Sequence, residues 1–228
     1  MNHEITTIPL SMPMGMGTVN TYLIKSAASY LLIDTGGSSA RKELLDSLER
    51  SGCSGKDLKL ILITHGDFDH IGNAAYLRSA FGSRIAMHRD DSGMAEQGDM
   101  FVNRKKPNII IKLLLPLFSR FGKKERFLPD FHVKDGDSLS EYGFDAKVYS
   151  LPGHSKGSIG ILTTQGELFC GDLFENTKSP KLNSLMDDPA AARESIEILK
   201  RLSIKTVYPG HGQPFSMESL LENITTTD

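Results

Sequence analysis

The segment at residues 64–72, Thr-His-Gly-Asp-Phe-Asp-His-Ile-Gly, constrains this chain more than any other. It follows a largely apolar run at residues 58–63, which predicts a strand buried on both faces. It leads into residues 73–82, which predict a helix that ends near Gly82. Histidine and aspartate at this density, on a turn after a buried strand, are the ligand types of a divalent metal site. The four candidate ligands are His65, Asp67, Asp69 and His70.

One ion could hardly use all four side chains, because those of the sequence neighbours Asp69 and His70 should diverge. His65 and Asp67 are two positions apart in the chain, so their side chains could converge on one ion while Asp69 and His70 bind a second. The alternative interpretation of this segment alone is a polar loop in which Asp69 caps the following helix.

Three further strand ends carry a side chain that can bind a metal. They are Pro152-Gly153-His154, Gly171-Asp172 and Pro209-Gly210-His211. Each follows an apolar predicted strand, and each places the candidate ligand beside a glycine that allows the backbone to turn tightly. A single histidine of this kind is more often a turn residue than a ligand. Four such strand ends in one chain, all with histidine or aspartate, favour a metal centre.

The remaining pattern predicts an alternation of strands and helices in both halves of the chain. This alternation favours two layers of strands with helices outside them. Asp188 and Pro189 are a typical start for a helix, with aspartate as the cap and proline in the first turn, and Ser38 or Ser39 could cap the helix before Gly52. The predicted strands are 5–10, 21–24, 30–33, 58–63, 84–88, 131–133, 146–150, 158–162, 168–170 and 206–208, and the predicted helices are 40–50, 73–82, 90–97, 188–202 and 216–223.

Composition narrows the class of protein. The chain has 228 residues, 39% hydrophobic and 24% charged, which is typical of one globular domain with a full core. A net charge of −2 gives no reason to expect a nucleic-acid partner. We expect no signal peptide and no membrane-spanning segment. Cys53 and Cys170 are too few and too far apart for a disulfide framework, so we expect reduced thiols in a cytoplasmic protein.

One segment differs from the rest. Residues 104–126 carry eight basic side chains against Glu125 alone, a local charge of +7 that leaves −9 for the remainder. Residues 108–118 are strongly apolar and predict a helix interrupted near Pro116. A basic apolar segment can cover a ligand, bind a partner or lie on a membrane surface, and the plain alternative is a core-packed helix with solvated ends. We expect residues 98–131 to form an insertion that serves as a substrate lid; a homodimer interface there is a further expectation, and membrane contact by 104–126 a weaker one.

Taken together, the motif at 65–70, Pro152-Gly153-His154, Gly171-Asp172 and Pro209-Gly210-His211 resemble the ordered motifs of the metallo-β-lactamase superfamily, and Asp34 resembles its first motif. The likeness covers residues 5–212 and is closest to the small glyoxalase-II-like and lactonase-like members. It implies an α/β fold, a four-layer αββα sandwich with a helical insertion, formed by residues 1–228 as one domain.

The resemblance also implies a role for each motif residue. His65, Asp67 and His154 would hold one metal ion, while Asp69, His70 and His211 would hold a second, with Asp172 bridging the two. Asp34 would orient a ligand or the motif loop. The expected cofactors are two divalent metal ions, with zinc first.

Asp67 departs from the family pattern, which has histidine at this position. An aspartate oxygen lies two bonds beyond Cβ, as does the nearer imidazole nitrogen, so we expect Asp67 to remain a ligand. A third carboxylate makes the site more negative and favours manganese or iron as alternatives to zinc. Flavodiiron proteins of the superfamily carry glutamate here and use iron, which keeps a redox function open.

We expect hydrolysis of an ester-like bond, a thioester or a lactone, in a small substrate that carries an acyl chain or an anionic group. Two metal ions would activate a bridging water, one would polarise the carbonyl, and Asp69 or Asp172 would take or relay the proton. The alternative is a non-heme iron oxidoreductase or dioxygenase. A third reading is a binding protein without catalysis, whose insertion docks a partner. Weaker candidates for contact with the site are Asn20, Cys170 and Tyr208.

Overall fold

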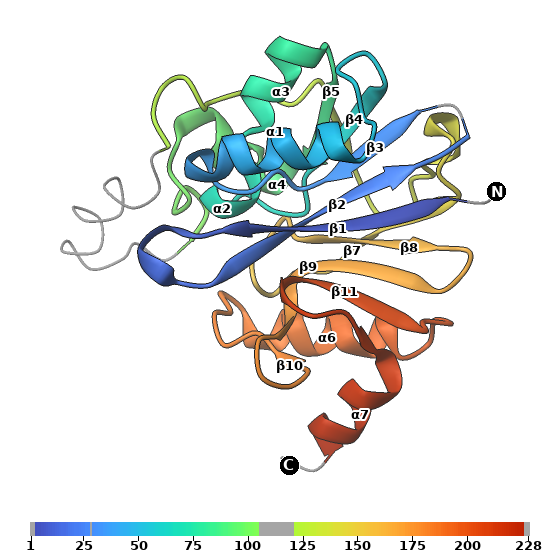
Figure 1. Cartoon of the computed structure of the whole chain (residues 1–228). Helices are drawn as coiled ribbons and strands as arrows, with labels where there is room; N and C mark the ends of the chain where they lie inside the picture. Colours follow the sequence, from blue (N-terminus) through green and yellow to red (C-terminus); the bar gives the residue numbers. More distant parts are fainter. Residues whose placement is uncertain (1–2, 28, 105–120, 226–228) are drawn as a thin grey trace.

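The computed structural model describes residues 3–27, 29–104 and 121–225. Two six-stranded sheets face each other, with helices on both outer sides (Figure 1). The order of the first sheet is β1-β2-β3-β4-β5-β6, and that of the second is β12-β11-β9-β8-β7, with β10 paired to β9. The architecture is the four-layer αββα sandwich that the sequence predicts.

The first sheet changes from antiparallel to parallel at β3. Strands β1, β2 and β3 pair antiparallel, whereas β3, β4, β5 and β6 pair parallel. Because parallel strands are covered on both faces, β3 and β4 are almost continuously apolar, as the sequence predicts. The strand bounds are β1 Glu4–Ser11, β2 Thr18–Lys25, β3 Tyr30–Ile33, β4 Leu58–Leu62, β5 Arg84–His88 and β6 Phe131–Val133.

The second sheet holds the C-terminal half. Its strands β7, β8 and β9 pair antiparallel, and β9 pairs parallel with β11. Both β9 and β11 are longer than predicted, because the sheet continues through Gly171 and Gly210, where the sequence predicts strand ends. The bounds are β7 Ala146–Ser150, β8 Ile159–Thr163, β9 Glu167–Asn176, β10 Lys181–Leu182, β11 Thr206–Gly212 and β12 Phe215–Ser216.

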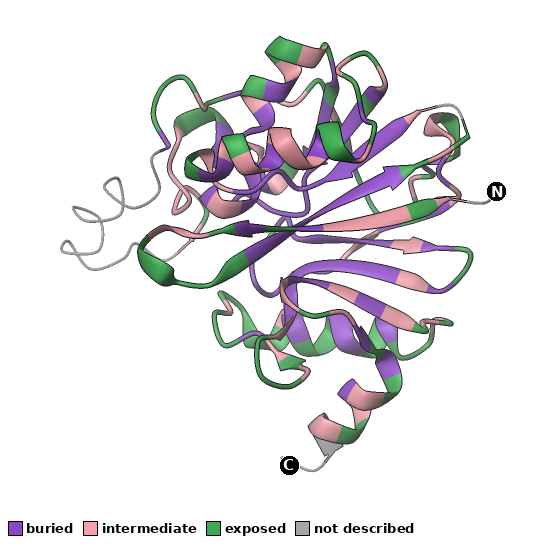
Figure 2. Cartoon of the chain, viewed as in Figure 1, coloured by how far each residue is buried: buried purple, intermediate pink, exposed green. Residues whose placement is uncertain are grey.

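Three apolar clusters hold the four layers together. One lies between the first sheet and its helices, the second between the two sheets, and the third between the second sheet and α6 and α7. Figure 2 shows the buried residues concentrated along both sheets and on the inner sides of the helices. The helices are α1 Arg41–Arg50, α2 Phe68–Ile71, α3 Ala74–Phe81, α4 Arg89–Gln97, α6 Pro189–Leu199 and α7 Met217–Thr225, with short 3-10 turns at Pro13–Gly15, Ser38–Ala40 and Ser140–Tyr142.

Two helix-end predictions are confirmed and one is wrong. The Asp188 side chain accepts hydrogen bonds from the amides of Ala190 and Ala191, at 3.0 and 3.1 Å. Gly82 ends α3 with a φ of +72° in the left-handed region. Neither Ser38 nor Ser39 caps α1, because both lie in the preceding 3-10 turn and Ala40 is the cap position.

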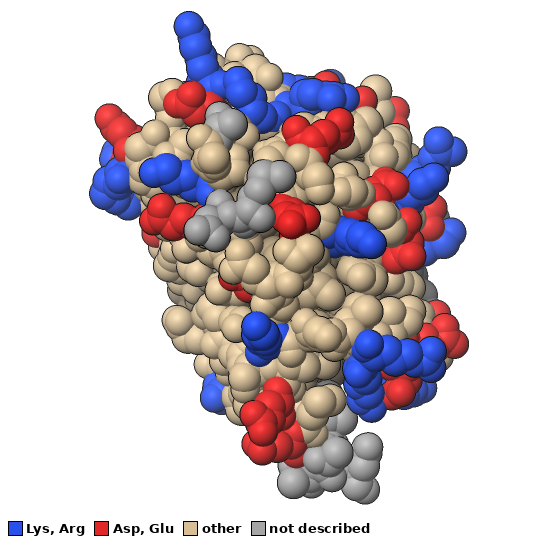
Figure 3. Space-filling view, turned by 90° about the vertical axis from the view of Figure 1, so that its right-hand side faces the viewer, with Lys and Arg blue, Asp and Glu red and all other residues tan. Residues whose placement is uncertain are grey.

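The insertion can be followed only in part. Residues 105–120, which include the predicted helix at 108–118, lie outside the described residues. Within the part that the structure describes, no helix is long and apolar enough to cross a bilayer. On the face shown in Figure 3, basic and acidic side chains are interspersed rather than separated into areas of one sign.

Candidate metal centre

Six of the seven predicted ligands gather in two groups at one edge of the sandwich. The first group is His65, His154 and Asp172, and the second is Asp69, His70 and His211. Within each group the ligand atoms lie within 4.8 Å of one another. These side chains come from both sheets: β4 leads into the first motif, β7 into His154, and β9 and β11 carry the last two residues.

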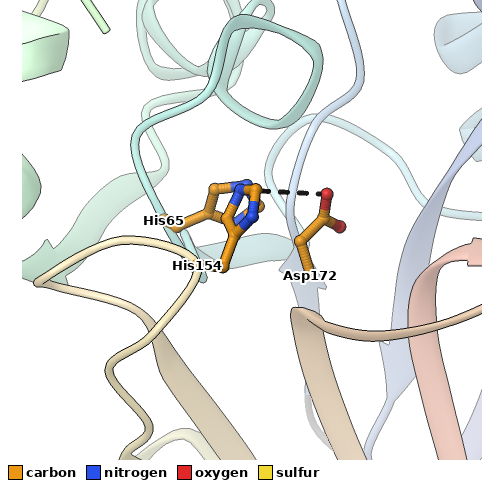
Figure 4. Close-up of side chains that lie close together, drawn as sticks. All are labelled: His65, His154 and Asp172. Atoms are coloured by element: carbon orange, nitrogen blue, oxygen red, sulfur yellow. Dashed lines mark ion pairs between the residues drawn. The ribbon is translucent and has the colours of Figure 1, made fainter. Parts of the chain in front are cut away.

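Asp172 links the two groups. Its Oδ1 lies 3.3 Å from His70 Nε2, and its Oδ2 lies 3.4 Å from His211 Nε2 and 3.9 Å from His154 Nε2. Figure 4 shows the rings of His65 and His154 beside each other, with the Asp172 carboxylate directed toward them. A carboxylate in this position can serve both groups at once.

All four histidines are oriented in the same way. His154 Nδ1 donates to the carbonyl oxygen of Leu185 at 2.6 Å, and His211 Nδ1 donates to that of Thr18 at 2.8 Å. His70 Nδ1 donates to the Asp34 carboxylate at 2.8 Å. With Nδ1 fixed as the donor, Nε2 is the nitrogen of each ring that is left to bind an ion.

Asp34 also determines the orientation of His65. Thr64 donates its hydroxyl hydrogen to Asp34 Oδ2 at 2.7 Å, so its oxygen can only accept from His65 Nδ1, 3.0 Å away. The other Asp34 oxygen accepts from the Thr64 amide at 2.8 Å. Asp34 is itself held in the left-handed region, with a φ of +59° that aspartate tolerates better than most residues. One buried carboxylate therefore fixes two histidines.

Three buried atoms in this centre test whether a cation fits. Among the described residues, His65 Nε2, His70 Nε2 and Asp172 Oδ1 lack hydrogen-bond partners. Buried polar atoms are normally paired, and these three are directed at the same space. Imidazole nitrogen and carboxylate oxygen are the donor set of zinc, manganese or iron(II). The residues present therefore fit two divalent ions.

Asp67 lies at the rim of the first group rather than within it. Its Oδ2 is 3.0 Å from His154 Nε2 and 3.7 Å from His65 Nε2. Its Oδ1 forms an ion pair with Arg104, a residue of the insertion. The structure thus places one oxygen of Asp67 toward the predicted metal site and the other toward a cation of the chain itself.

The pKa shifts reflect the same charges. Burial lowers the pKa of His65, and the neighbouring histidines add to this effect. Burial opposes the charged forms of His70 and His154 too, but adjacent carboxylates outweigh it and raise both pKa values. The pKa of His211 is raised to about 10, because Asp172 and Asp69 outweigh burial. Protons on these rings balance the carboxylates, as metal ions could.

The two groups differ in their access to solvent. The side chains of His65, His154 and Asp172 are at most 8% exposed. In the second group Asp69 is 26% exposed and His211 16%. The centre is therefore more open to solvent on the side of Asp69 and His211.

Several further residues hold the loops and strands that carry the candidate ligands. Buried Asp91 accepts hydrogen bonds from the amides of Gly66 and Gly157 and from the Ser155 hydroxyl, and so joins the loops that carry His65 and His154. Asn20, one of the weaker candidates, donates to the carbonyl oxygens of Pro209 and Gly212 and so holds the backbone on both sides of His211. Nothing in the local pattern around Asp91 or Arg104 marks them, because their partners are distant in sequence.

The other weak candidates take no direct part. Burial raises the pKa of the Cys170 thiol to about 12, which keeps it protonated and unreactive. Tyr208 packs its ring against Phe169 and Tyr22 between the sheets. A cavity of about 610 Å³ lies beside the first group, and its lining includes Arg104, Lys156, Asp187 and His88.

Comparison with known proteins gives the family. The profile of the metallo-beta-lactamase superfamily matches residues 14–211. A probable metallo-hydrolase of Methanocaldococcus jannaschii is 28% identical over 85% of this chain and 87% of its own length. The hydroxyacylglutathione hydrolase GloC of Haemophilus influenzae is 30% identical, but the match covers only 63% of this chain and 60% of that enzyme. The bovine acyl-coenzyme A thioesterase MBLAC2 is 26% identical over 88% of this chain and 75% of its own length.

Solved structures agree with these relatives. A metallo-beta-lactamase family protein of Thermus thermophilus has a TM-score of 0.74 at 24% identity, covering 98% of this chain and 79% of that one. Another protein, TTHA1623, solved in a di-iron-bound form, has a TM-score of 0.69 at 25% identity, covering 92% and 94%. The matched profile spans most of the chain, and the fold and the order of its motifs agree with it. The chain belongs to the metallo-β-lactamase superfamily.

Proposed function

We propose that this protein is a metal-dependent hydrolase that cleaves an ester-like bond, a thioester or a lactone, with a pair of divalent ions. The observation that carries the proposal is the pair of ligand groups joined by Asp172, in which all four histidines present Nε2. Two ions held there would lower the pKa of a shared water and polarise a carbonyl. The hydroxyacylglutathione hydrolase and acyl-coenzyme A thioesterase among the relatives favour a thioester.

The chain's own residues would divide the remaining work. Asp69 combines a place in the second group with partial exposure, so its free oxygen is suited to accept a proton on the side from which substrate arrives. Asp172 is buried between the groups and would hold them at a fixed separation. Residues 98–131 would act as a lid over an acyl or anionic part of the substrate.

The first experiment measures metal content in the purified protein by inductively coupled plasma mass spectrometry. About two zinc or manganese ions per chain, with turnover of an acyl thioester or a lactone, is the expected result. Asp69→Asn should keep the fold and lose most of that turnover. Full metal content with full activity of Asp69→Asn on every substrate turned over would overturn the assignment of Asp69.

The second candidate is a non-heme iron oxidoreductase. The observation that favours it is the extra carboxylate of Asp67 beside His65 and His154, which suits iron better than an all-histidine set. The structural neighbour in a di-iron-bound form is in accord with it. Mainly iron in the purified protein, with oxygen consumption on glutathione persulfide, would select this function over hydrolysis.

A further inference from the structure

Arg104 belongs to the insertion, lies among the described residues and contacts the candidate metal centre. Its side chain is only 6% exposed, although arginine is rarely buried without partners. The guanidinium pairs with Asp67 Oδ1 through one terminal nitrogen, and its Nε donates to Asp187 at 2.6 Å. Its other terminal nitrogen donates to the carbonyl oxygen of His154 at 3.3 Å. Arg104 therefore connects the two loops that carry Asp67 and His154.

The ion pair divides the two oxygens of Asp67 between two tasks. Oδ1 is directed to Arg104, so Oδ2 is left toward His154 Nε2 and His65 Nε2. A carboxylate held in this way can offer only one oxygen to an ion. The charge of Arg104 offsets that of Asp67, although the same guanidinium also pairs with the more exposed Asp187, so Asp67 adds a ligand atom with less added negative charge than a free carboxylate would bring.

From this geometry we propose that Arg104 is a positioning residue that acts through Asp67: it neutralises this carboxylate and presents one of its oxygens to the first metal group. The inference rests on the proposed metal centre but does not depend on which bond the enzyme cleaves. The proposal implies that the effect of a positive charge at position 104 on metal binding depends on which residue occupies position 67. Arg104 suits the centre only while Asp67 is negative.

The test is a double-mutant cycle with D67H, R104Q and the combined variant. The neutral imidazole of D67H has a nitrogen two bonds from Cβ, as the carboxylate has, so it can still reach an ion. R104Q keeps a polar side chain but removes the charge. K156Q is the matched control, because Lys156 lines the same cavity but pairs with Asp90 and is 68% exposed. Zinc affinity is measured by chelator competition, and thermal unfolding is followed with and without zinc.

D67H alone should bind zinc at least tenfold more weakly, because the guanidinium then faces the ion without its carboxylate. Adding R104Q to D67H should raise the zinc affinity at least tenfold above that of D67H alone. R104Q alone should lower the unfolding midpoint of the metal-free protein but increase the rise that zinc produces, because an unpaired Asp67 attracts the ion more strongly. K156Q should match the wild type in all of these.

If Arg104 only held the two loops together, the result would be different. R104Q would then lower the midpoint equally with and without zinc, and its effect on zinc affinity would be the same with aspartate or histidine at position 67. Either finding overturns the proposal. Because the readouts are metal affinity and stability, loss of the hydrolase assignment would leave the inference intact, and a thioesterase without this coupling would refute the inference alone.

Discussion

Asp34→Asn is the sharpest test of how the chain prepares its histidines. Asp34 uses Oδ2 to accept from His70 Nδ1 and the Thr64 hydroxyl, and Oδ1 to accept from the Thr64 amide. Asparagine has nearly the same shape and tolerates a φ of +59°, so the backbone should not change. Only one of its two positions can accept, and this creates a conflict.

The conflict takes one of two forms. If the new NH₂ replaces Oδ2, it faces His70 Nδ1, and the ring can then keep a proton only on Nε2, where the metal would bind. If the amide group is reversed, the NH₂ faces the Thr64 amide and leaves a buried N–H unpaired, at a cost of about 1–3 kcal/mol. The metal-free protein adopts the first arrangement, and metal binding must enforce the second. That cost corresponds to a loss of roughly 5- to 150-fold in zinc affinity.

The assay is competition for zinc with a chromophoric chelator, followed by metal analysis after dialysis. Asp91→Asn is the matched control, because Asp91 is another fully buried carboxylate that accepts several hydrogen bonds but none from an imidazole. It should lower the unfolding midpoint while changing zinc affinity less than Asp34→Asn does. Zinc affinity of Asp34→Asn within threefold of the wild type would refute the tautomer argument.

Three further outcomes are expected. Gly210→Ala should abolish the binding of at least one metal ion, because a Cβ there would lie 2.0 Å from Asp172 Oδ1. Gly82→Ala is the control: there is open space around its Cβ, so it should affect stability alone. Metal analysis of the two purified variants distinguishes these results. Zinc affinity should rise between pH 6 and 8.5, because the pKa values of His70, His154 and His211 are raised and their protons must leave; calorimetry in buffers of different ionisation enthalpy should detect at least one released proton per chain. Protonated His211 stabilises the metal-free protein fully below about pH 6.5, and this stability is lost as the pH rises through about 10. Chelator-treated protein should therefore unfold at a lower temperature at pH 9 than at pH 7. Zinc should remove this difference.

The fold could be predicted because its signals are local. Apolar runs fixed the position of strands such as β3 and β4, and Asp188 with Pro189 marked the start of α6. Strand ends were less predictable where glycine served another purpose. The sequence predicts that strands end before Gly171 and Gly210, but β9 and β11 continue through these glycines. Added side chains there would meet Thr64 and Asp172, so both glycines provide space for the centre.

The candidate ligands could be located for the same reason, since each lies beside a turn signal in its own segment. The residues that orient them could not, apart from Asp34. The bond from His154 goes to the backbone of Leu185, and that from His211 goes to Thr18, 193 residues away in sequence. A backbone carbonyl has no residue signature, so only the folded chain identifies these partners.

Arg104 is a further residue whose partner could not be predicted from its own segment of the sequence. The eight basic residues in the segment at 104–126 predict a solvated or partner-binding charge, yet the first of them is buried against Asp67, 37 positions earlier. The expectation that a third carboxylate makes the candidate site more negative therefore left out a cation that the fold places beside it. Because burial of an unpaired charge is costly, a third aspartate in a closed centre requires a nearby cation in the metal-free protein. The structure identifies Arg104 as the residue that supplies this cation to Asp67.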